Sequence, residues 1–324
     1  MCGIVGVISD NPLDESIDKT IRFAVQKLSK RGPDFQDVLI NENSALGHAR
    51  LSILDTSEVS NQPMLDATGR YSIVFNGEIF NFKELRQDLI QTGVAFNTDS
   101  DTEVLLQLLI KEGKNGILKL NGFFAFCFWD NHSNSALLAR DRFGIKPLLY
   151  RFENKQLIFA SEIKAILPFQ ITREINFKAL NSFFRYNYIP APESIFTGIH
   201  KVMPACLIEW KGGEITIEKY YSYYPSDTTF KGSYGSAVQG VRSLLIDSTH
   251  QRMISDVPLG SFLSGGVDSS IVSAIAAKET KQLNTFSIGF KDQPQFDETK
   301  YANEVAKHIK SNHTVFSLSN DDLL

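Results

Sequence analysis

The sequence predicts two successive α/β domains, a layered sandwich of strands and helices followed by a parallel sheet. Three observations lead to this prediction. The chain has 324 residues, which suits two domains better than one. Its first part alternates short apolar strands with amphipathic helices, and a layered sandwich buries both kinds of apolar face. Its last part has the order strand, helix, strand, helix, strand, which is typical of a parallel sheet with right-handed crossovers.

The first domain is predicted to open with a strand over residues 2–8, where glycine alternates with branched apolar residues. An amphipathic helix over residues 17–28 should follow, and Gly32 and Pro33 should end it. The run 123–129 is almost wholly apolar, which suits a strand buried on both faces. The other elements expected in this domain are helices at residues 82–91 and 102–112 and strands at residues 37–40, 45–53, 71–75, 136–140, 148–152 and 156–161.

Prolines and aromatic residues become frequent after residue 187, so we expect the first domain to end near residue 210, with a connector at residues 211–232. Three parallel strands with incomplete cover would leave much apolar surface in water, and we therefore expect this sequence to be the front portion of a longer protein. Its last residues, 320–324, resemble a helix start. The second domain, residues 233–324, is predicted to contain helices at residues 236–253, 271–278 and 298–310, strands at residues 259–263, 284–290 and 314–317, and a glycine-rich turn at residues 264–270.

The composition, with 43% hydrophobic and 22% charged residues, is that of a soluble globular protein. Its three widely spaced cysteines are typical of a reduced, cytoplasmic protein. A net charge of −4 gives no sign of a nucleic-acid or membrane partner, and no apolar run is long enough to cross a bilayer. The N-terminus lacks the pattern of a signal peptide. Cys2, Cys127 and Cys206 are far apart and have neither disulfide nor zinc spacing, and we interpret the last two as core residues.

Cys2 is a candidate nucleophile because of its position. Aminopeptidases usually remove an initiator Met before a small residue, which would leave Cys2 with a free α-amine whose ordinary pKa is about 7.7–8.0. That amine can take the thiol proton, directly or through one water, and hand it to a leaving amine. Taken alone, Cys2 is better explained as a small apolar residue at the end of a strand.

Polar residues downstream change that interpretation. Arg50 ends a strand, where it could clamp a carboxylate or form a surface salt bridge. Asn76 and Gly77 follow a strand, where an amide and a backbone N–H could form an oxyanion hole or an ordinary hairpin turn. Glu78 could accept a hydrogen bond from a substrate ammonium or be exposed. Asp101 could bind an amine, or it or its neighbour could cap the following helix.

Together these residues resemble the class II glutamine amidotransferases, and the match covers roughly the first 210 residues. Each motif is weak alone, but the set in this order is highly specific. Two of the motifs, those that begin at Arg31 and Arg140, resemble architecture more than chemistry. The matching motifs are Met1-Cys2-Gly3-Ile4, Arg31-Gly32-Pro33-Asp34, Arg50-Leu51-Ser52-Ile53, Phe75-Asn76-Gly77-Glu78-Ile79, Ser100-Asp101-Thr102-Glu103, Arg140-Asp141-Arg142-Phe143-Gly144 and Ala160-Ser161-Glu162.

This resemblance implies an N-terminal-nucleophile fold, an αββα sandwich. It implies that Cys2 is the nucleophile and that Asn76 and Gly77 form the oxyanion hole. Within the implied glutamine site, Arg50 binds the substrate carboxylate, and Glu78 and Asp101 bind its amine. Backbone groups near Leu51 and Ile53 help to hold the substrate. The implied glutamine-binding residues are Arg50, Leu51, Ile53, Asn76, Gly77, Glu78 and Asp101.

A glycine- and serine-rich turn, Ser264-Gly265-Gly266-Val267-Asp268-Ser269-Ser270, lies between a predicted strand and a predicted helix. Backbone N–H groups in such a turn can hold phosphate oxygens, although the loop lysine of a Walker A motif is absent and a polar helix cap is the alternative. The string resembles the pyrophosphate loop of the ATP pyrophosphatases, which implies that Asp268 helps to bind magnesium. A lone Asp is otherwise more often solvated. The implied ATP-binding residues are Leu263, Ser264, Gly265, Gly266, Asp268, Ser269, Ser270 and Ile288.

The order of the two motif sets resembles the glutamine-hydrolysing asparagine synthetases, which are ligases. That family hydrolyses glutamine to glutamate and ammonia, and the ammonia aminates an aspartyl-adenylate made from aspartate and ATP, giving asparagine, AMP and pyrophosphate. The resemblance thus implies glutamine, aspartate and ATP as substrates, with magnesium, and no nucleic acid or membrane partner. A homodimer is left open. The family's second glycine- and acid-rich loop has no match here, so this chain alone is expected to hydrolyse glutamine without necessarily making asparagine.

Two other functions are compatible with the sequence. One is an amidotransferase that aminates a different acceptor. The relatives that close β-lactam rings generally lack the N-terminal cysteine, and the class II enzymes with phosphoribosyl or sugar-phosphate acceptors lack the glycine- and serine-rich turn found here at residues 264–270. The other is a degenerate, non-catalytic nucleotide-binding module, which the set of polar residues around Cys2 disfavours.

Overall fold

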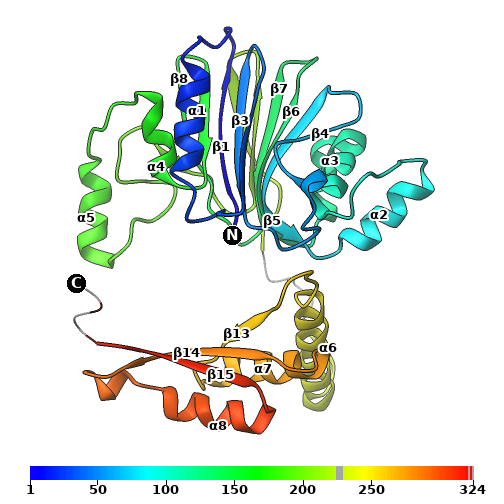
Figure 1. Ribbon diagram of the computed structural model, residues 1–324, viewed down its shortest axis with the longest axis vertical. Helices are drawn as coiled ribbons and strands as arrows, with labels where there is room; N and C mark the ends of the chain where they lie inside the picture. The colour runs from blue at the N-terminus through cyan, green and yellow to red at the C-terminus, as the bar shows by residue number, and fades with distance from the viewer. Residues whose placement is uncertain (224–228, 320–321, 323–324) are drawn as a thin grey trace. The chain divides into compact units, whose positions relative to one another are not determined.

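The computed structural model describes residues 1–223, 229–319 and 322. The chain divides into two compact units, Met1–Tyr224 and Pro225–Leu324 (Figure 1). Within the described residues, no helix is both long enough and apolar enough to cross a membrane. The helix start predicted at residues 320–324 lies outside the described residues apart from residue 322, as do residues 224–228 of the predicted connector.

The first unit is built on two six-stranded antiparallel sheets packed face to face (Figure 1). In the first sheet the strand order is β10-β8-β9-β1-β3-β2, and in the second it is β12-β11-β7-β6-β5-β4. The strands are β1 (Gly3–Ser9), β2 (Phe35–Ile40), β3 (Ser44–Arg50), β4 (Met64–Leu65), β5 (Tyr71–Ile79), β6 (Gly122–Asp130), β7 (Ser135–Arg140), β8 (Leu149–Glu153), β9 (Gln156–Ala160), β10 (His200–Lys201), β11 (Cys206–Lys211) and β12 (Glu214–Lys219).

Helices cover the outer faces of both sheets, which confirms the predicted αββα sandwich. Helices α1 and α4 pack on the first sheet, and α3, with α2 beside it, packs on the second (Figure 1). The helices of this unit are α1 (Ile17–Gln26), α2 (Phe82–Gln91), α3 (Asp101–Glu112), α4 (Ile163–Ile166) and α5 (Phe177–Tyr186), with short 3-10 turns at Glu58–Ser60, Gly113–Lys119 and Leu167–Phe169.

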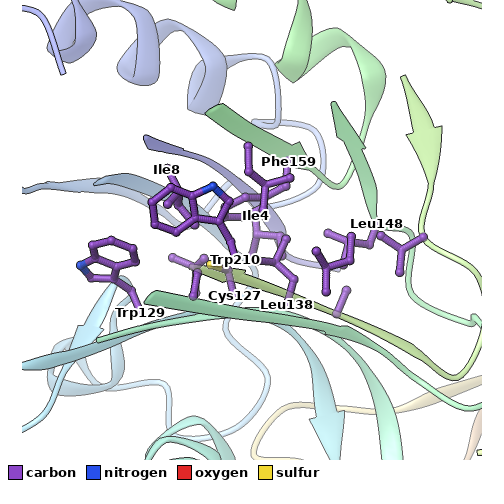
Figure 2. Close-up of a cluster of buried hydrophobic side chains, with 14 of the residues drawn as sticks. Ile4, Ile8, Cys127, Trp129, Leu138, Leu148, Phe159 and Trp210 are labelled. Carbon is purple, nitrogen blue, oxygen red and sulfur yellow. The ribbon is translucent and has the colours of Figure 1, made fainter. Parts of the chain in front are cut away.

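Strand β1 is buried on both faces, and its alternate residues serve two different cores. Ile4 and Ile8 point into the cluster between the sheets, which also holds the only two tryptophans of the chain, Trp129 and Trp210 (Figure 2). The valines between them pack instead against α1 and α4. This alternation follows from the period-2 geometry of a strand. Cys127 and Cys206 belong to the cluster between the sheets, as predicted.

A buried histidine joins the two sheets. His48, on β3, donates a hydrogen bond of 3.1 Å from its Nε2 to the carbonyl oxygen of Phe75, on β5 of the other sheet. Burial lowers the pKa of His48 to about 3, against a smaller opposing effect of that hydrogen bond. The ring is therefore neutral. Its hydrogen bond fixes the position of Phe75 on β5 relative to His48 on β3.

Several boundaries in the first unit differ from the predictions, and three of these differences affect the site or the division into domains. Strand β5 does not end at Phe75 but runs to Ile79, so Asn76 and Gly77 pair with residues of β6 and are not a turn. The apolar run of β6 supplies a partner strand, and this pairing overrides the local turn preference of Asn-Gly. Strand β3 ends at Arg50, three residues earlier than predicted. Strand β12 lies within the residues expected to be a connector, so the first unit extends past residue 210. Helices α4 and α5 and strands β4, β10 and β11 were not predicted.

The second unit contains a three-stranded parallel sheet in the order β13-β14-β15, as the strand and helix order predicted. The turn predicted at residues 264–270 is shorter than expected, because α7 begins at Val267, so that Asp268, Ser269 and Ser270 lie in its first turn. The elements are α6 (Tyr234–Gln251), β13 (Gly260–Phe262), α7 (Val267–Glu279), β14 (Asn284–Phe290), α8 (Thr299–Ile309) and β15 (Asn312–Leu318), with a 3-10 turn at Pro294–Phe296.

The histidine between the sheets predicts a specific pH dependence of stability. We expect His48→Gln, whose amide can still donate to Phe75, to lower the free energy of unfolding by about 1–3 kcal/mol at pH 7. The difference between wild type and variant should shrink as the pH falls below about 6.5, because the unfolded chain then protonates His48 while the folded chain does not. Denaturant unfolding followed by tryptophan fluorescence measures this, since both tryptophans lie in the core of the first unit. A difference that stays constant from pH 7 to pH 5 would contradict the neutral, buried ring.

Candidate active site

One pocket of the first unit brings together all of the residues that the sequence associates with glutamine. They come from the start of β1, the end of β3, the C-terminal half of β5 and the first turn of α3. These segments are far apart in the sequence, and their convergence follows from the pairing of the strands. The predicted residues that line the pocket are Cys2, Arg50, Leu51, Ile53, Asn76, Gly77, Glu78 and Asp101.

The thiol of Cys2 is held by the backbone at the end of β3. Its Sγ lies 3.4 Å from the N–H of Leu51, which donates to it, and 3.6 Å from the Leu51 carbonyl oxygen, to which the thiol can donate. Burial raises the pKa of the Cys2 thiol, against the smaller lowering effects of the Leu51 hydrogen bond and of nearby positive charge. The thiol is therefore protonated at rest, so a base must remove its proton before it can attack.

The side-chain amide of Asn76 has the features of a ligand-binding group. Asn76 is 0% exposed, and neither its amide nitrogen nor its amide oxygen has a hydrogen-bond partner within the described residues. Buried polar groups are nearly always paired, so an unpaired amide that lines a pocket is available to bind a partner there. Gly77 must be glycine, because a Cβ there would lie 2.3 Å from the carbonyl oxygen of Phe123. Because Gly77 lets β5 pair closely with β6, the neighbouring residue Asn76 is held in place beside the pocket.

The guanidinium of Arg50 is buried and already holds a loop of its own chain. Its Nη1 donates to the carbonyl of Ser57 at 2.8 Å and to Oδ1 of Asn61 at 2.6 Å, and its Nη2 donates to the carbonyls of Asp55 and Leu54. This differs from the surface salt bridge that the sequence left open as an alternative. In this structure Arg50 therefore forms one wall of the pocket together with residues 54–61.

Two acidic residues, Glu78 and Asp101, also line the pocket. Asp101 is buried, and its Oδ2 accepts a hydrogen bond of 2.9 Å from the N–H of Ile79. Burial raises the pKa of Asp101 to about 7, the hydrogen bonds to its carboxylate lower it, and the neighbouring charge of Glu78 raises it further. Ser100, not Asp101, caps α3, because its hydroxyl accepts from the N–H of Glu103. Asp101 is therefore not used as the helix cap, and it lines the pocket. A substrate ammonium bound there could stabilise the ionised form of its carboxylate.

Several residues that line the pocket were not predicted. Lys146 is only 7% exposed although it belongs to no motif, and it is positioned by the Arg140–Gly144 motif that the sequence suggested to be architectural. Asp141 accepts a hydrogen bond of 2.9 Å from the N–H of Lys146, and Arg140 donates to the Lys146 carbonyl. Gln62 accepts from the N–H of Phe75 at 2.6 Å and so supports β5 beside Asn76. The only sequence signal for Lys146 was its closeness to that motif.

The predicted nucleotide loop lies in the second unit. Gly265 has φ of +85°, and a Cβ there would lie 2.5 Å from the backbone nitrogen of Ala302, so only glycine fits. The hydroxyls of Ser264 and Ser269 lie 3.0 Å apart and tie the loop to the first turn of α7, while the Ser270 hydroxyl is buried without a partner within the described residues. Gly266 precedes α7 directly and its N–H faces the same loop.

The remaining predicted nucleotide residues differ in their exposure. The side chain of Leu263 is buried against Ala302 and Ala306, so it is not available to a ligand. Ile288, on β14, is half exposed, and Asp268 is exposed in the first turn of α7. No group of three or more His, Cys, Asp or Glu side chains with metal-binding geometry occurs within the described residues.

Comparison with known protein families agrees with this division. The glutamine amidotransferase domain family matches residues 1–221. The chain belongs to the glutamine amidotransferase family. The match covers the whole αββα sandwich through β12, and the asparagine synthase family matches residues 240–324, in the second unit.

The relatives of this amidotransferase domain include longer proteins. "Asparagine synthetase [glutamine-hydrolyzing] 1" of Bacillus subtilis is 39% identical over 94% of the chain, which spans 48% of that protein. A putative asparagine synthetase of Methanocaldococcus jannaschii is 35% identical over 97% of the chain, which spans 64% of it. The chain thus spans about half to two thirds of the length of these relatives. Among solved structures, the glutamine phosphoribosylpyrophosphate amidotransferase of B. subtilis is similar, with a TM-score of 0.54, 14% identity, and 100% of this chain and 92% of that one covered. At this identity it supports the fold alone.

The raised pKa of Asp101 predicts that its ionised carboxylate, the form that would bind an ammonium, destabilises the folded chain. We expect Asp101→Asn to keep the hydrogen bond from Ile79 and to raise the free energy of unfolding above pH 7 by up to about 4 kcal/mol, because the folded wild type then carries a buried charge. This gain should decrease as the pH falls from 7 and vanish near pH 4, where the unfolded carboxyl is also protonated. Tryptophan fluorescence during denaturant unfolding measures it at pH 5 and pH 8. Equal gains at the two pH values would show that Asp101 is not a destabilised carboxylate.

Proposed function

We propose that the first unit is a glutaminase in which Cys2 attacks the side-chain amide of glutamine. The observation that carries this proposal is the buried, unpaired amide of Asn76 in the same pocket as the thiol of Cys2. An amide that donates to a developing oxyanion stabilises the tetrahedral intermediate of acyl transfer. Membership of the amidotransferase family supports the same reaction.

The pocket supplies the groups that each step requires. After removal of Met1, the α-amine of Cys2 would take the thiol proton, and the thiolate would add to the amide carbon of glutamine. Asn76 and the Gly77 N–H would stabilise the oxyanion. The protonated amine would then give its proton to the leaving ammonia, and water would hydrolyse the resulting γ-glutamyl thioester to glutamate.

The polar groups at the two sides of the pocket match the α-substituents of glutamine. Asp101 and Glu78 would bind the α-ammonium, and the ionised form of Asp101 is the one that binds. Arg50 would bind the α-carboxylate, which requires its guanidinium to exchange some of its present bonds to residues 54–61. Leu51 and Ile53 also line the pocket, and backbone groups near them would help to hold the substrate.

We further propose that this unit supplies ammonia to asparagine synthesis in the cytoplasm. The match of residues 240–324 to the asparagine synthase family supports this acceptor, as do the names of the relatives. ATP would bind at Ser264, Gly265, Gly266, Ser269 and Ser270, with Leu263 only through its backbone and Ile288 at the adenosine. A single exposed carboxylate beside a phosphate-binding loop suits magnesium that is held mostly by phosphates, so Asp268 fits that role. Aspartate would be activated as its adenylate, and ammonia would displace AMP.

The two alternatives make different use of the same pocket. An amidotransferase with another acceptor would keep every group around Cys2 and change only the second reaction. A degenerate nucleotide-binding module would not need the unpaired amide of Asn76, which disfavours it. Glutamate release without asparagine, in the presence of ATP and aspartate, would favour another acceptor or a second unit that needs further residues.

The glutaminase proposal predicts that two substitutions act on different quantities. Cys2→Ala should abolish glutamate release from glutamine. Asn76→Ala should lower kcat by about 10²–10³ while KM changes only a few-fold, because the amide acts on the oxyanion rather than on bound glutamine. Cys206→Ala is the matched control, since it removes a buried thiol of the same unit that does not line the pocket. Release that persists in Cys2→Ala, or is absent from folded wild type lacking Met1, would overturn the proposal.

A further inference from the structure

Asp55 lies beside the pocket and has no role in the reaction described above. It belongs to the loop after β3 and has φ of +44°, a left-handed conformation that is uncommon for residues other than glycine. Its backbone carbonyl accepts a hydrogen bond from Nη2 of Arg50. Asp55 is therefore in direct contact with the residue proposed to bind the α-carboxylate of glutamine.

The carboxylate of Asp55 connects two segments that are 44 residues apart. Its Oδ1 accepts from the N–H of Ser57 at 3.2 Å and from the Ser57 hydroxyl, within its own loop. Its Oδ2 accepts from the Ser60 hydroxyl at 2.6 Å and from the N–H of Asp99 at 2.9 Å. Asp99 is two residues before Asp101, so this last bond reaches the segment that carries Asp101.

These bonds require an ionised carboxylate. Partial burial raises the pKa of Asp55, but the hydrogen bonds from Ser57, Ser60 and Asp99 outweigh it and bring the pKa to about 2. Each oxygen receives one backbone N–H, which can only donate. An asparagine at this position would turn its NH₂ group toward one of those two N–H groups in either orientation. It would therefore break either the loop turn or the bond to Asp99.

We propose that Asp55 is a positioning residue that ties the Arg50 wall of the pocket to the Asp101 wall and thereby sets its affinity for the α-amino acid part of glutamine. This inference rests on the proposed glutaminase function. Arg50 donates hydrogen bonds to Ser57 and Asn61 in the loop of residues 54–61. Asp55 joins the same loop to the segment before α3 through the N–H of Asp99. The spacing between the carboxylate-binding and the amine-binding groups then depends on Asp55 together with Gln62, whose Nε2 donates to Oγ1 of Thr102 at 3.2 Å. The thiol, which is held by Leu51, does not depend on Asp55.

The test compares Asp55→Asn with Asp66→Asn in the full chain. Asp66 is a matched control, because its carboxylate also accepts from the hydroxyl and the backbone N–H of the residue two positions later, Thr68. Its bond from the N–H of Tyr71, however, stays within its own hairpin. We expect Asp55→Asn to raise KM for glutamine at least about tenfold and to lower kcat less than about threefold, with Asp66→Asn close to wild type. Equal KM values for the two variants would overturn the inference.

Two thiol reagents separate positioning from general damage. 6-Diazo-5-oxo-L-norleucine carries both α-substituents of glutamine, whereas iodoacetamide carries neither. Asp55→Asn should slow inactivation by the first reagent about tenfold and leave alkylation of Cys2 by the second unchanged. Equal slowing with both reagents would mean that the thiol itself is displaced and would contradict the proposal.

The outcome also distinguishes this inference from the proposed function. Wild type that does not hydrolyse glutamine would sink the glutaminase proposal, whatever the variants do. Wild-type activity with no difference between Asp55→Asn and Asp66→Asn would sink only the role of Asp55. If Asp55→Asn does not fold, Ser57→Ala removes one bond to the same carboxylate and should raise KM about two- to fivefold, and an unchanged KM would count against the proposal.

Discussion

The antiparallel pairing of β1 with β3 is the interaction on which the pocket depends. Gly3 pairs with Ala49, so Cys2 lies where β3 ends at Arg50, and the Leu51 backbone meets the thiol. Strand β1 is buried on both faces, which gives the nucleophile a rigid support directly behind it. A residue so close to the chain terminus would otherwise be among the most mobile parts of a domain. The central position of β1 in its sheet removes that freedom.

The apolar core between the sheets holds the second sheet to this support, and a specific hydrogen bond near the pocket adds to it. His48 on β3 bonds to the carbonyl of Phe75, and the next residue along β5 is Asn76. Gln62 bonds to the N–H of the same Phe75 and so fixes β5 from another side. The backbone that carries Asn76 is therefore fixed, although nothing within the described residues bonds to its side-chain amide. Preorganised donors of this kind are the form that electrostatic catalysis takes in acyl transfer.

The sequence was sufficient to predict the two-part organisation, because strand alternation is a local property, whereas the grouping of residues around Cys2 was predicted from the resemblance of the ordered motifs to a known family. It could not predict that Asn76 and Gly77 lie inside β5, because their pairing with β6 is a long-range contact that opposes a strong local turn preference. Lys146, Gln62 and Asp55 were missed for a related reason. A lysine, a glutamine or an aspartate is common on any surface, and only the fold makes these three converge on one pocket or its rim.

The central claim is that Cys2 forms a covalent γ-glutamyl intermediate with glutamine in this pocket. Rapid acid quenching of the full chain with glutamine, followed by mass spectrometry of the N-terminal peptide, tests it directly. The account predicts a peptide that begins at Cys2, without Met1, and carries one γ-glutamyl group, with more of it trapped early in turnover than late. An unmodified peptide at every time point, in a preparation that releases glutamate, would contradict the account, because hydrolysis would then proceed without the thioester.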